Sequence, residues 1–198
     1  MRLGVLASHG GSVLQAVIDA IEAGKLGVEV VLVISNNSGS QALQRAKRHD
    51  LAIMHLSRLT HPDPADLDVA MTNAFTSVGA QWLLLAGYMK KLGPTTLATF
   101  HNRILNTHPA LLPKFGGQGF YGRNVHEAVI AAGERESGAT VHLVEGDYDT
   151  GPIVSQTRVV VRASDAPEDL EARVKDAERA LIVATLTELA ETSEAAHS

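Results

Sequence analysis

Short, almost uninterrupted apolar runs recur along this chain of 198 residues. They lie at 3–7, 28–34, 82–86 and 104–108, and their length suits strands rather than helices. A strand with one face in water alternates apolar and polar residues, whereas a continuous apolar run is typical of a strand buried on both faces of a parallel sheet. We therefore expect a parallel sheet that is covered on both sides.

Segments with the period of an amphipathic helix lie between these runs, at 12–23, 40–48 and 64–78. The first begins with Ser12 and Gln15, in the spacing of a capping box. Alternation of strands and helices predicts an α/β fold with a doubly wound, mainly parallel sheet flanked by helices. Two later runs predict further strands near the C-terminus, with antiparallel strands among them, at 140–144 and 153–161.

The last helix is predicted to start near Asp165. Pro167 and the two acidic residues after it suit a first turn, because proline is tolerated there and the helix dipole favours negative charge. Apolar residues then recur at helical spacing, so this helix should dock on the sheet. The small, polar tail 192–198 is expected to be frayed. Without an internal repeat or a linker, the sequence predicts one domain, 1–198.

The composition restricts the classes of function. A hydrophobic content of 45% is enough for a sizeable core. The formal net charge of -5 argues against wrapping nucleic acid, which needs a basic face. The absence of cysteine excludes disulfides, thiolate metal sites and a cysteine nucleophile. The apolar runs are too short for a signal peptide or a membrane span, so we expect a soluble, cytoplasmic protein.

The run with the clearest chemistry is 104–115, Ile-Leu-Asn-Thr-His-Pro-Ala-Leu-Leu-Pro-Lys-Phe. Asn106 and His108 lie two residues apart on a predicted strand, so their side chains project from the same face. An amide donor beside an imidazole can hold the oxygen of a tetrahedral acyl-transfer intermediate and supply a proton. His-Pro is also a common strand exit, and Asn-x-His alone would be a weak signal. The full run is much more specific.

A glycine-containing turn, Ser8-His9-Gly10-Gly11-Ser12, connects the first strand to the first helix. Glycines let the backbone approach a ligand, and the free amides of a helix N-terminus suit a phosphate. The turn matches neither G-x-G-x-x-G nor Walker A, so it lacks a dinucleotide or nucleoside triphosphate motif. From the residues alone, a tight structural turn and an anion site are equally good interpretations.

The run 106–115 resembles the catalytic segment of the folate-dependent formyltransferases, and the similarity extends over nearly the whole chain. The resemblance implies a Rossmann-like formyltransferase fold. It also implies transfer of a formyl group from 10-formyltetrahydrofolate to the amine of 5-phosphoribosylglycinamide (GAR) in purine biosynthesis, without a metal. Asn106 and His108 would be catalytic together with an aspartate. The matching Asp-x-Gly-Pro segment points to Asp149 rather than Asp147, although such an aspartate is also an ordinary turn former.

The same resemblance implies which residues bind the substrates. GAR would be held by Gly11, Ser12, Val13, Lys175 and Glu178; relatives usually carry Asn in place of Val13, and Lys175 with Glu178 could otherwise be a surface ion pair. The folate would lie against Met89, Lys90, Lys91, Leu92, Asn106, Glu145, Gly146, Asp147 and Tyr148. The arginine that relatives place near the folate tail has no counterpart here, and Lys90 or Arg58 are candidate substitutes.

Segment 116–124, Gly-Gly-Gln-Gly-Phe-Tyr-Gly-Arg-Asn, is longer than the family pattern and rich in glycine. We interpret it as a flexible lid that closes over the site and excludes water. His126 and His142 are candidates for structural or ligand contacts, and each is assigned to the core or to a loop first. His126-Glu127 lacks a second histidine four residues on, so no zinc site is expected.

Other functions stay open on the sequence alone. A formyltetrahydrofolate deformylase would give the formyl group to water, and other formyltransferases act on amines such as amino-sugar nucleotides. Enzymes of these kinds usually carry a further domain, so we expect the length of this chain to disfavour both. A non-catalytic nucleotide-binding module would not bring Asn106, His108 and Asp149 into one cleft. The oligomeric state is also open, with a homodimer as one alternative.

Overall fold

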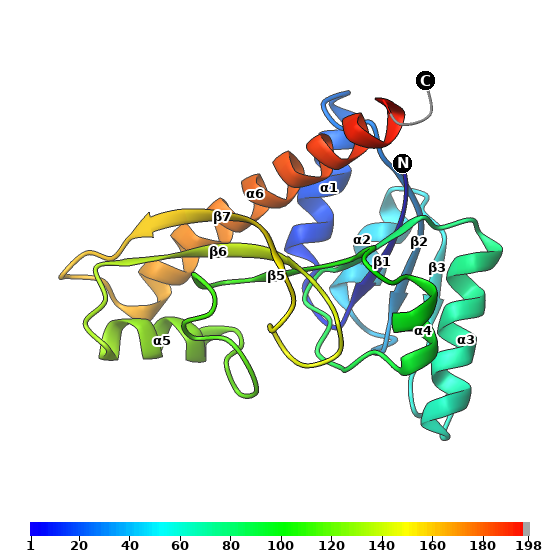
Figure 1. Cartoon of the computed structure of the whole chain (residues 1–198), viewed down its shortest axis with the longest axis horizontal. Coiled ribbons are helices and arrows are strands. Elements are labelled where there is room, and N and C mark those ends of the chain that lie inside the picture. Colours follow the sequence, from blue (N-terminus) through cyan, green and yellow to red (C-terminus); the bar gives the residue numbers. More distant parts are fainter. Residues whose placement is uncertain (196–198) are drawn as a thin grey trace.

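The computed structural model describes residues 1–195, and its centre is a seven-stranded sheet flanked by helices (Figure 1). The strands are β1 (Arg2–Ala7), β2 (Glu29–Ser35), β3 (Ile53–His55), β4 (Trp82–Leu85), β5 (Ile104–His108), β6 (Glu136–Leu143) and β7 (Ile153–Val160). The helices are α1 (Ser12–Glu22), α2 (Gln41–Arg48), α3 (Pro64–Ser77), α4 (Pro94–Thr99), α5 (Arg123–Ala131) and α6 (Pro167–Ala195).

The strand order is β3-β2-β1-β4-β5-β6-β7. The pairs up to β4–β5 are parallel, and β6 and β7 are added antiparallel. The predicted doubly wound, mainly parallel sheet with late antiparallel strands is therefore confirmed. The chain winds in one direction from β1 to β3 and in the other from β4 onward. Ligands of such sheets bind where this order reverses, beyond the carboxyl ends of β1 and β4.

Both faces of the sheet are buried, as the apolar runs predicted. Neighbouring residues of β1 point to opposite faces, so Val5 packs in the cluster formed with α1, α2 and α6, whereas Leu6 packs in the cluster formed with α3. Phe75 of α3 meets Phe100 edge to face, with 6.3 Å between ring centroids. A sheet that is covered on both sides leaves its strand ends as the accessible edge.

A buried polar cluster holds the chain where it leaves β5. The Thr140 hydroxyl donates to the Ala110 carbonyl (2.7 Å) and accepts from the Leu112 amide (3.2 Å). The Gln156 side-chain amide donates to the Leu112 carbonyl (3.0 Å) and to the Thr140 hydroxyl (2.9 Å). The turn after His108 is thus fixed to β6 and β7 by side chains rather than by a sheet ladder.

The predicted capping box is wrong. Helix α1 begins at Ser12 itself, and its N-cap is Gly11, whose φ of 69° is left-handed; no side chain caps it. The Gln15 side chain instead donates to Asp19 and accepts from Arg45. Because Ser12 already lies within the helix, its hydroxyl is free of any capping role.

Three short elements were not predicted from the sequence: β3, α4 and α5. Helix α5 begins at Arg123, inside the segment 116–124 that was expected to be a loop. A frayed tail was predicted from 192, but α6 continues to Ala195, with the Thr192 hydroxyl bonded to the Glu188 carbonyl. The last part of that predicted tail, 196–198, lies outside the described residues.

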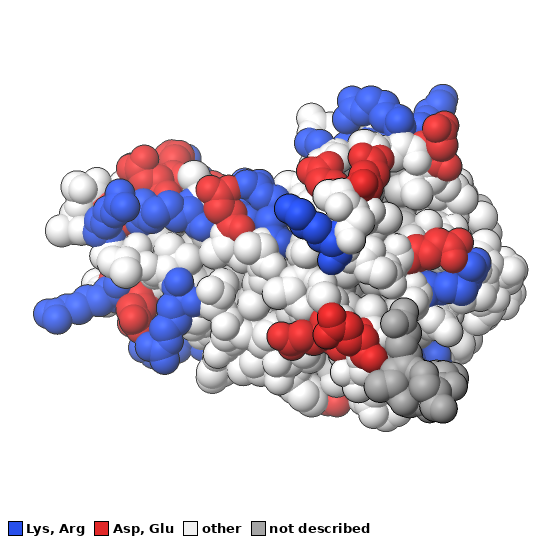
Figure 2. Space-filling model, turned by 90° about the horizontal axis from the view of Figure 1, so that it is seen from above, with Lys and Arg blue, Asp and Glu red and all other residues white. Residues whose placement is uncertain are grey.

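Acidic and basic side chains are interspersed on the face seen in Figure 2. Ion pairs among the described residues include Arg158 with Glu136 (2.7 Å) and Lys114 with Glu134 (2.7 Å). Within residues 1–195, no helix is both long and apolar enough to cross a bilayer.

Replacing Thr140 with valine tests the polar cluster after β5. The variant keeps the volume of the side chain but leaves the Ala110 carbonyl and the Leu112 amide without their partner. We expect the free energy of unfolding to fall by about 2 kcal/mol, measured by urea denaturation. Thr192→Val on the exposed end of α6 is the control and should change it by less than about 0.5 kcal/mol. An equally small effect of Thr140→Val would contradict this role.

Candidate active site

A cavity of about 480 Å³ opens at the carboxyl edge of the sheet, where the strand order reverses. This volume is in the range of small-molecule sites. Its wall comes from the turn before α1, the ends of β4 and β5, the glycine-rich segment 116–124, and helices α5 and α6. It is therefore built from parts of the chain that are far apart in sequence.

Ser8 fixes this edge of the sheet. Its hydroxyl donates to the side-chain oxygen of Asn36 (2.6 Å) and accepts from the Met89 amide (2.8 Å). Its own amide donates to the Gly87 carbonyl (3.1 Å). Because these residues follow β1, β2 and β4, one buried serine ties three strand ends together and gives the cavity a rigid floor.

The turn before α1 needs glycine at position 11 for two reasons. The φ of Gly11 is left-handed, and a Cβ there would lie 2.8 Å from the Ala42 Cβ and 2.9 Å from its Cα. The preceding Gly10 carbonyl accepts from the Arg45 guanidinium (2.9 Å), which holds the turn from behind. Gly11, Ser12 and Val13 line the cavity at a helix N-terminus, where backbone amides lack intrahelical acceptors.

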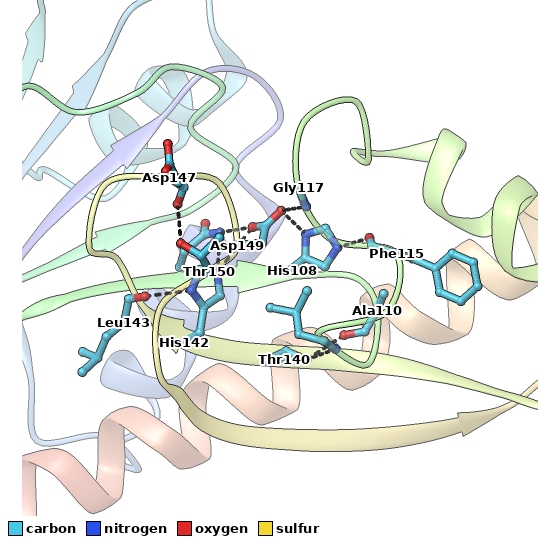
Figure 3. A network of polar contacts seen from close by, with 12 residues as sticks. His108, Ala110, Phe115, Gly117, Thr140, His142, Leu143, Asp147, Asp149 and Thr150 are labelled. Carbon is cyan, nitrogen blue, oxygen red and sulfur yellow. Dashed lines mark hydrogen bonds and ion pairs between the residues drawn. The ribbon is translucent and has the colours of Figure 1, made fainter.

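The Asp149 carboxylate is the meeting point of the polar side chains (Figure 3). One oxygen accepts from the Asn106 side-chain amide (3.3 Å) and lies 3.4 Å from His142 Nε2. The other accepts from the Gly117 amide (3.0 Å) and lies 3.3 Å from His108 Nδ1. The structure thus brings together the three side chains that were predicted as the catalytic set.

The contacts of His108 show which of its two ring nitrogens carries a proton. Nε2 lies 2.7 Å from the Phe115 carbonyl, which can only accept, so Nε2 carries a proton. Nδ1, which faces Asp149, is therefore the nitrogen that gains or loses the titrating proton. The imidazole is almost completely buried, with 4% of the residue exposed.

Burial and the charge of the partner shift the pKa values of His108 and Asp149 in opposite directions. Burial lowers the pKa of His108, and the Asp149 carboxylate opposes that shift. Burial alone would raise the pKa of Asp149, but the charge of His108 and the hydrogen bond from the Gly117 amide oppose this effect, and the pKa lies below its usual range. The carboxylate is therefore ionised, and it lies beside an imidazole whose pKa stays below its ordinary value because burial outweighs the effect of Asp149.

His142 orients the Asn106 amide. Its Nδ1 donates to the Leu143 carbonyl (2.8 Å), so Nε2 of the neutral ring accepts from Asn106 Nδ2 (3.0 Å). Both amide hydrogens of Asn106 then have acceptors, His142 and Asp149. An oxygen arriving from a ligand has to take one of them, and the longer contact, to Asp149, is the weaker one.

Most residues predicted to bind folate lie around a second, smaller cavity of about 50 Å³ that Asn106 also lines. Its wall includes Lys90, Lys91, Leu92, Gly146, Asp147 and Tyr148. Met89 lines the larger cavity instead, and Glu145 lines neither. Lys91 bridges the two loops around the smaller cavity, with its ammonium 2.9 Å from Asp147 and 5.1 Å from the centre of the Tyr148 ring.

Lys175 and Glu178 both line the larger cavity, but they are not each other's closest partners. Lys175 pairs with Glu171 (2.5 Å), one turn earlier on α6. Burial raises the pKa of Glu178, and a hydrogen bond with Thr107 opposes the shift. The larger cavity therefore has two carboxyl groups and one ammonium along the face of α6.

Sequence reasoning missed three members of this site. Glu171 was not singled out, and His142 was assigned first to the core or a loop; His126, assigned in the same way, is a third such residue, in the wall of the larger cavity. A strand-pairing argument could have found His142, because it is the direct antiparallel partner of Asn106 in β5 and β6. In the part of the chain that the structure describes, no group of three or more His, Asp or Glu is arranged to hold a metal ion.

Comparison with known proteins by family profile, by sequence and by structure finds formyltransferases in each case. The profile of the formyl transferase family matches residues 1–186. The chain is 40% identical over 189 residues to the phosphoribosylglycinamide formyltransferase of Mycobacterium tuberculosis, which covers 96% of this chain and 85% of that protein. It is similar in structure to glycinamide ribonucleotide transformylase 1 from Symbiobacterium toebii, with a TM-score of 0.90, 33% identity, and coverage of 97% of this chain and 88% of that one.

The plant relatives are longer than this chain. It is 36% identical over 183 residues to the chloroplastic phosphoribosylglycinamide formyltransferase of Arabidopsis thaliana, which covers 92% of this chain and 63% of that protein. The chain thus spans less than two thirds of the length of that relative.

Asp149→Asn tests the coupling between Asp149 and His108. Removing the carboxylate removes the charge that opposes the burial of the imidazolium, so the pKa of His108 should fall below its value in the unmodified chain. Titration of the imidazole followed by NMR measures this. Asp147→Asn is the matched control, because that side chain is exposed and paired with Lys91. Equal titration of His108 in both variants would contradict the coupling.

Proposed function

The chain belongs to the formyl transferase family, and on this premise we propose that it transfers a formyl group from 10-formyltetrahydrofolate to the amine of GAR, in de novo purine biosynthesis. The observation that carries the proposal is the meeting of Asn106, His108 and Asp149 in the wall of a cavity of small-molecule size. An amide donor, a titratable imidazole and an ionised carboxylate are the groups that such a transfer needs. We include the whole chain, 1–198, in one formyltransferase domain.

The reaction moves one carbon between two nitrogens. The amine of GAR attacks the formyl carbon, and a tetrahedral intermediate with a negatively charged oxygen forms. The bond between that carbon and N10 of the folate then breaks. The proton that the amine loses is returned to N10, so the products are formyl-GAR and tetrahydrofolate.

Each polar side chain has a role in this scheme. Asn106 donates to the oxygen of the intermediate by giving up its weaker contact with Asp149. The imidazolium form of His108 stabilises the same oxygen and supplies a proton, and Asp149 favours that charged form. His142 holds the Asn106 amide with its donors turned toward the reaction centre. Because these groups are already oriented, little reorganisation is needed during the reaction.

The two cavities suit the two substrates. The free amides at Gly11, Ser12 and Val13 suit the phosphate of GAR; such backbone contacts are unaffected by valine at position 13. Lys175 and Glu178 suit the rest of GAR. The residues around the smaller cavity are the ones we assign to the folate ring system, and Met89 extends the folate site along the larger cavity.

Lys90 is the better substitute for the arginine of relatives at the folate tail. It lines the smaller cavity, whereas the exposed Arg58 lines neither. The glycine-rich segment 116–124 acts in this proposal as the lid. The Gly117 amide of this segment donates to Asp149, and Phe120 packs close to Phe115, with 6.2 Å between ring centroids. A cytoplasmic location is part of the same proposal, and a homodimer is one arrangement compatible with it.

Alanine variants of the central residues test the chemistry. Losing one oxyanion donor typically lowers turnover by roughly 10²–10³. We therefore expect Asn106→Ala and His108→Ala to fold normally and to lose at least that much turnover, followed by the absorbance change on tetrahydrofolate release. The exposed residues Asn73 and His101 provide matched controls, Asn73→Ala and His101→Ala. Near-full turnover of either central variant would refute its role.

The same assay, run with and without GAR, separates transfer from hydrolysis. Release of tetrahydrofolate only when GAR is present supports the proposed transferase. Release at the same rate without GAR identifies a deformylase and overturns the proposal.

Gly11→Ala tests the phosphate turn. The added Cβ would meet the backbone of Ala42, so the turn has to shift, and we expect the KM for GAR to rise by about tenfold or more. Gly24→Ala is the control, because Gly24 has nearly the same left-handed φ but open space around it. Both variants should lose roughly 1–2 kcal/mol of stability from the backbone conformation alone. An unchanged KM for GAR in Gly11→Ala would show that the turn does not bind the substrate.

A further inference from the structure

His126 is a buried titratable side chain that the scheme above leaves without a role. It lies on α5, only 1% of the residue is exposed, and it belongs to the wall of the larger cavity. Its Nδ1 atom has no hydrogen-bond partner among the described residues. Buried polar atoms without partners are rare in folded proteins, so each such atom calls for a specific explanation.

The packing of α5 holds this ring in place. α5 lies against α6 through an apolar cluster that includes Val125 and Val129 of α5 and Leu170 and Val174 of α6. Val125 directly precedes His126 and is completely buried. The imidazole therefore cannot turn out to solvent without moving the helix.

The surroundings of His126 indicate the chemistry of its missing partner. Burial lowers the pKa of the ring, while the Glu171 carboxylate raises it and the Lys175 ammonium lowers it. The imidazole is therefore neutral at physiological pH, and the two nearby charges already neutralise each other in an ion pair. A neutral imidazole beside a neutralised pair suits an uncharged hydrogen-bonding group, such as a hydroxyl or a carboxamide, rather than a phosphate.

His126 shares the cavity wall with the groups proposed to hold the two ends of the substrate. The anion-binding turn at Gly11 and the reactive group at His108 contribute separate parts of the cavity wall, and His126 belongs to the same wall with the α6 residues Glu171 and Lys175. A substrate with a phosphate at one end and an amine at the other has its uncharged part between them. For GAR, that part is the ribose with its hydroxyls and the carboxamide.

We propose that His126 is a further binding residue for the amine substrate, whose imidazole forms a hydrogen bond with a ribose hydroxyl or with the carboxamide. This inference rests on the proposed function, because it assumes that GAR occupies the larger cavity. It adds a contact from α5 to those from α1 and α6, so that three separate elements position the amine for attack.

Ser137 provides a matched control. It is 2% exposed and is not part of the cavity wall, and within residues 1–195 its hydroxyl is the other buried side-chain atom without a partner. If the unpaired atom of His126 were only a packing defect, replacing either residue with an apolar one would leave ligand binding unchanged. If His126 binds the substrate, only its own replacement affects binding.

The test compares His126→Phe, His126→Asn and Ser137→Ala with the unmodified chain. Phenylalanine keeps a ring but no nitrogen, whereas asparagine keeps a polar atom near the position of Nδ1. Calorimetric titration with GAR alone, without the formyl donor, gives Kd for each protein. We expect Kd to rise about tenfold or more in His126→Phe, to recover partly in His126→Asn and to be unchanged in Ser137→Ala. The KM for 10-formyltetrahydrofolate should stay the same throughout.

Titration with ribose 5-phosphate separates the two candidate partners. It keeps the sugar and the phosphate but lacks the carboxamide. Weaker binding of ribose 5-phosphate to His126→Phe assigns the contact to a hydroxyl. An effect on GAR alone assigns it to the carboxamide.

Binding of GAR to His126→Phe within twofold of the unmodified chain would overturn the inference. If this variant fails to fold, ¹⁵N NMR of the unmodified chain gives an independent test, with His126→Asn used for assignment. The His126 imidazole nitrogens should shift when GAR is added, and unshifted signals at saturation would also overturn it. Failure of the unmodified chain to bind GAR would instead refute the proposed function.

Discussion

The Asp149 carboxylate accepts hydrogen bonds from the Asn106 side chain and the Gly117 amide, and it lies beside the imidazoles of His108 and His142. These four groups come from three parts of the chain: β5, β6 and the glycine-rich segment 116–124. A buried carboxylate is stable only when it is paired and hydrogen-bonded, so the surrounding elements have to meet at this point. The backbone of Asp149 has a left-handed φ of 56°, a conformation that aspartate tolerates better than most residues. Gly116 lies so close that a Cβ there would be 2.4 Å from Leu112 Cδ2 and 3.3 Å from Asp149 Cβ. The position of the Asp149 carboxylate therefore depends on the conformation of segment 116–124, and that conformation depends in turn on Asp149.

The hydrogen bonds of His108 and Asp149 also fix the backbone next to the site. His108 bonds to the Phe115 carbonyl, and Asp149 accepts from the Gly117 amide, so both members of the pair hold the start of segment 116–124. His142 bonds to a backbone carbonyl and so presents a lone pair, not a proton, to Asn106. One amide, two imidazoles and one carboxylate thus have mutually defined hydrogen positions before any substrate arrives. Preorganisation of this kind is what makes polar groups effective in catalysis.

The sequence predicted those features that local patterns decide. The spacing of Asn106 and His108 on a strand, and the burial of β1 on both faces, follow from the two-residue period alone. The position of Asp149, 43 residues after Asn106, does not, because it depends on how β6 and β7 fold back; the family resemblance supplied it. His142 is buried as expected, but its contact with Asn106 was missed for the same reason, since strand register sets it. The capping box failed because a close contact with Ala42 fixed Gly11 as the N-cap instead.

Helix α5 was missed because it begins inside the glycine-rich segment 116–124, which was expected to be a loop. Its stability comes from packing on α6 through Val125 and Leu170, which is a tertiary effect. This packing also explains how His126 can remain buried with Nδ1 unpaired. The apolar contacts of the neighbouring residues outweigh the free energy lost by leaving that nitrogen without a hydrogen bond. Features that local sequence does not encode, such as α5 and the pairing of Asn106 with His142, are thus the ones that complete the cavity wall. They belong to the arrangement of the whole chain, and only its three-dimensional structure reveals them.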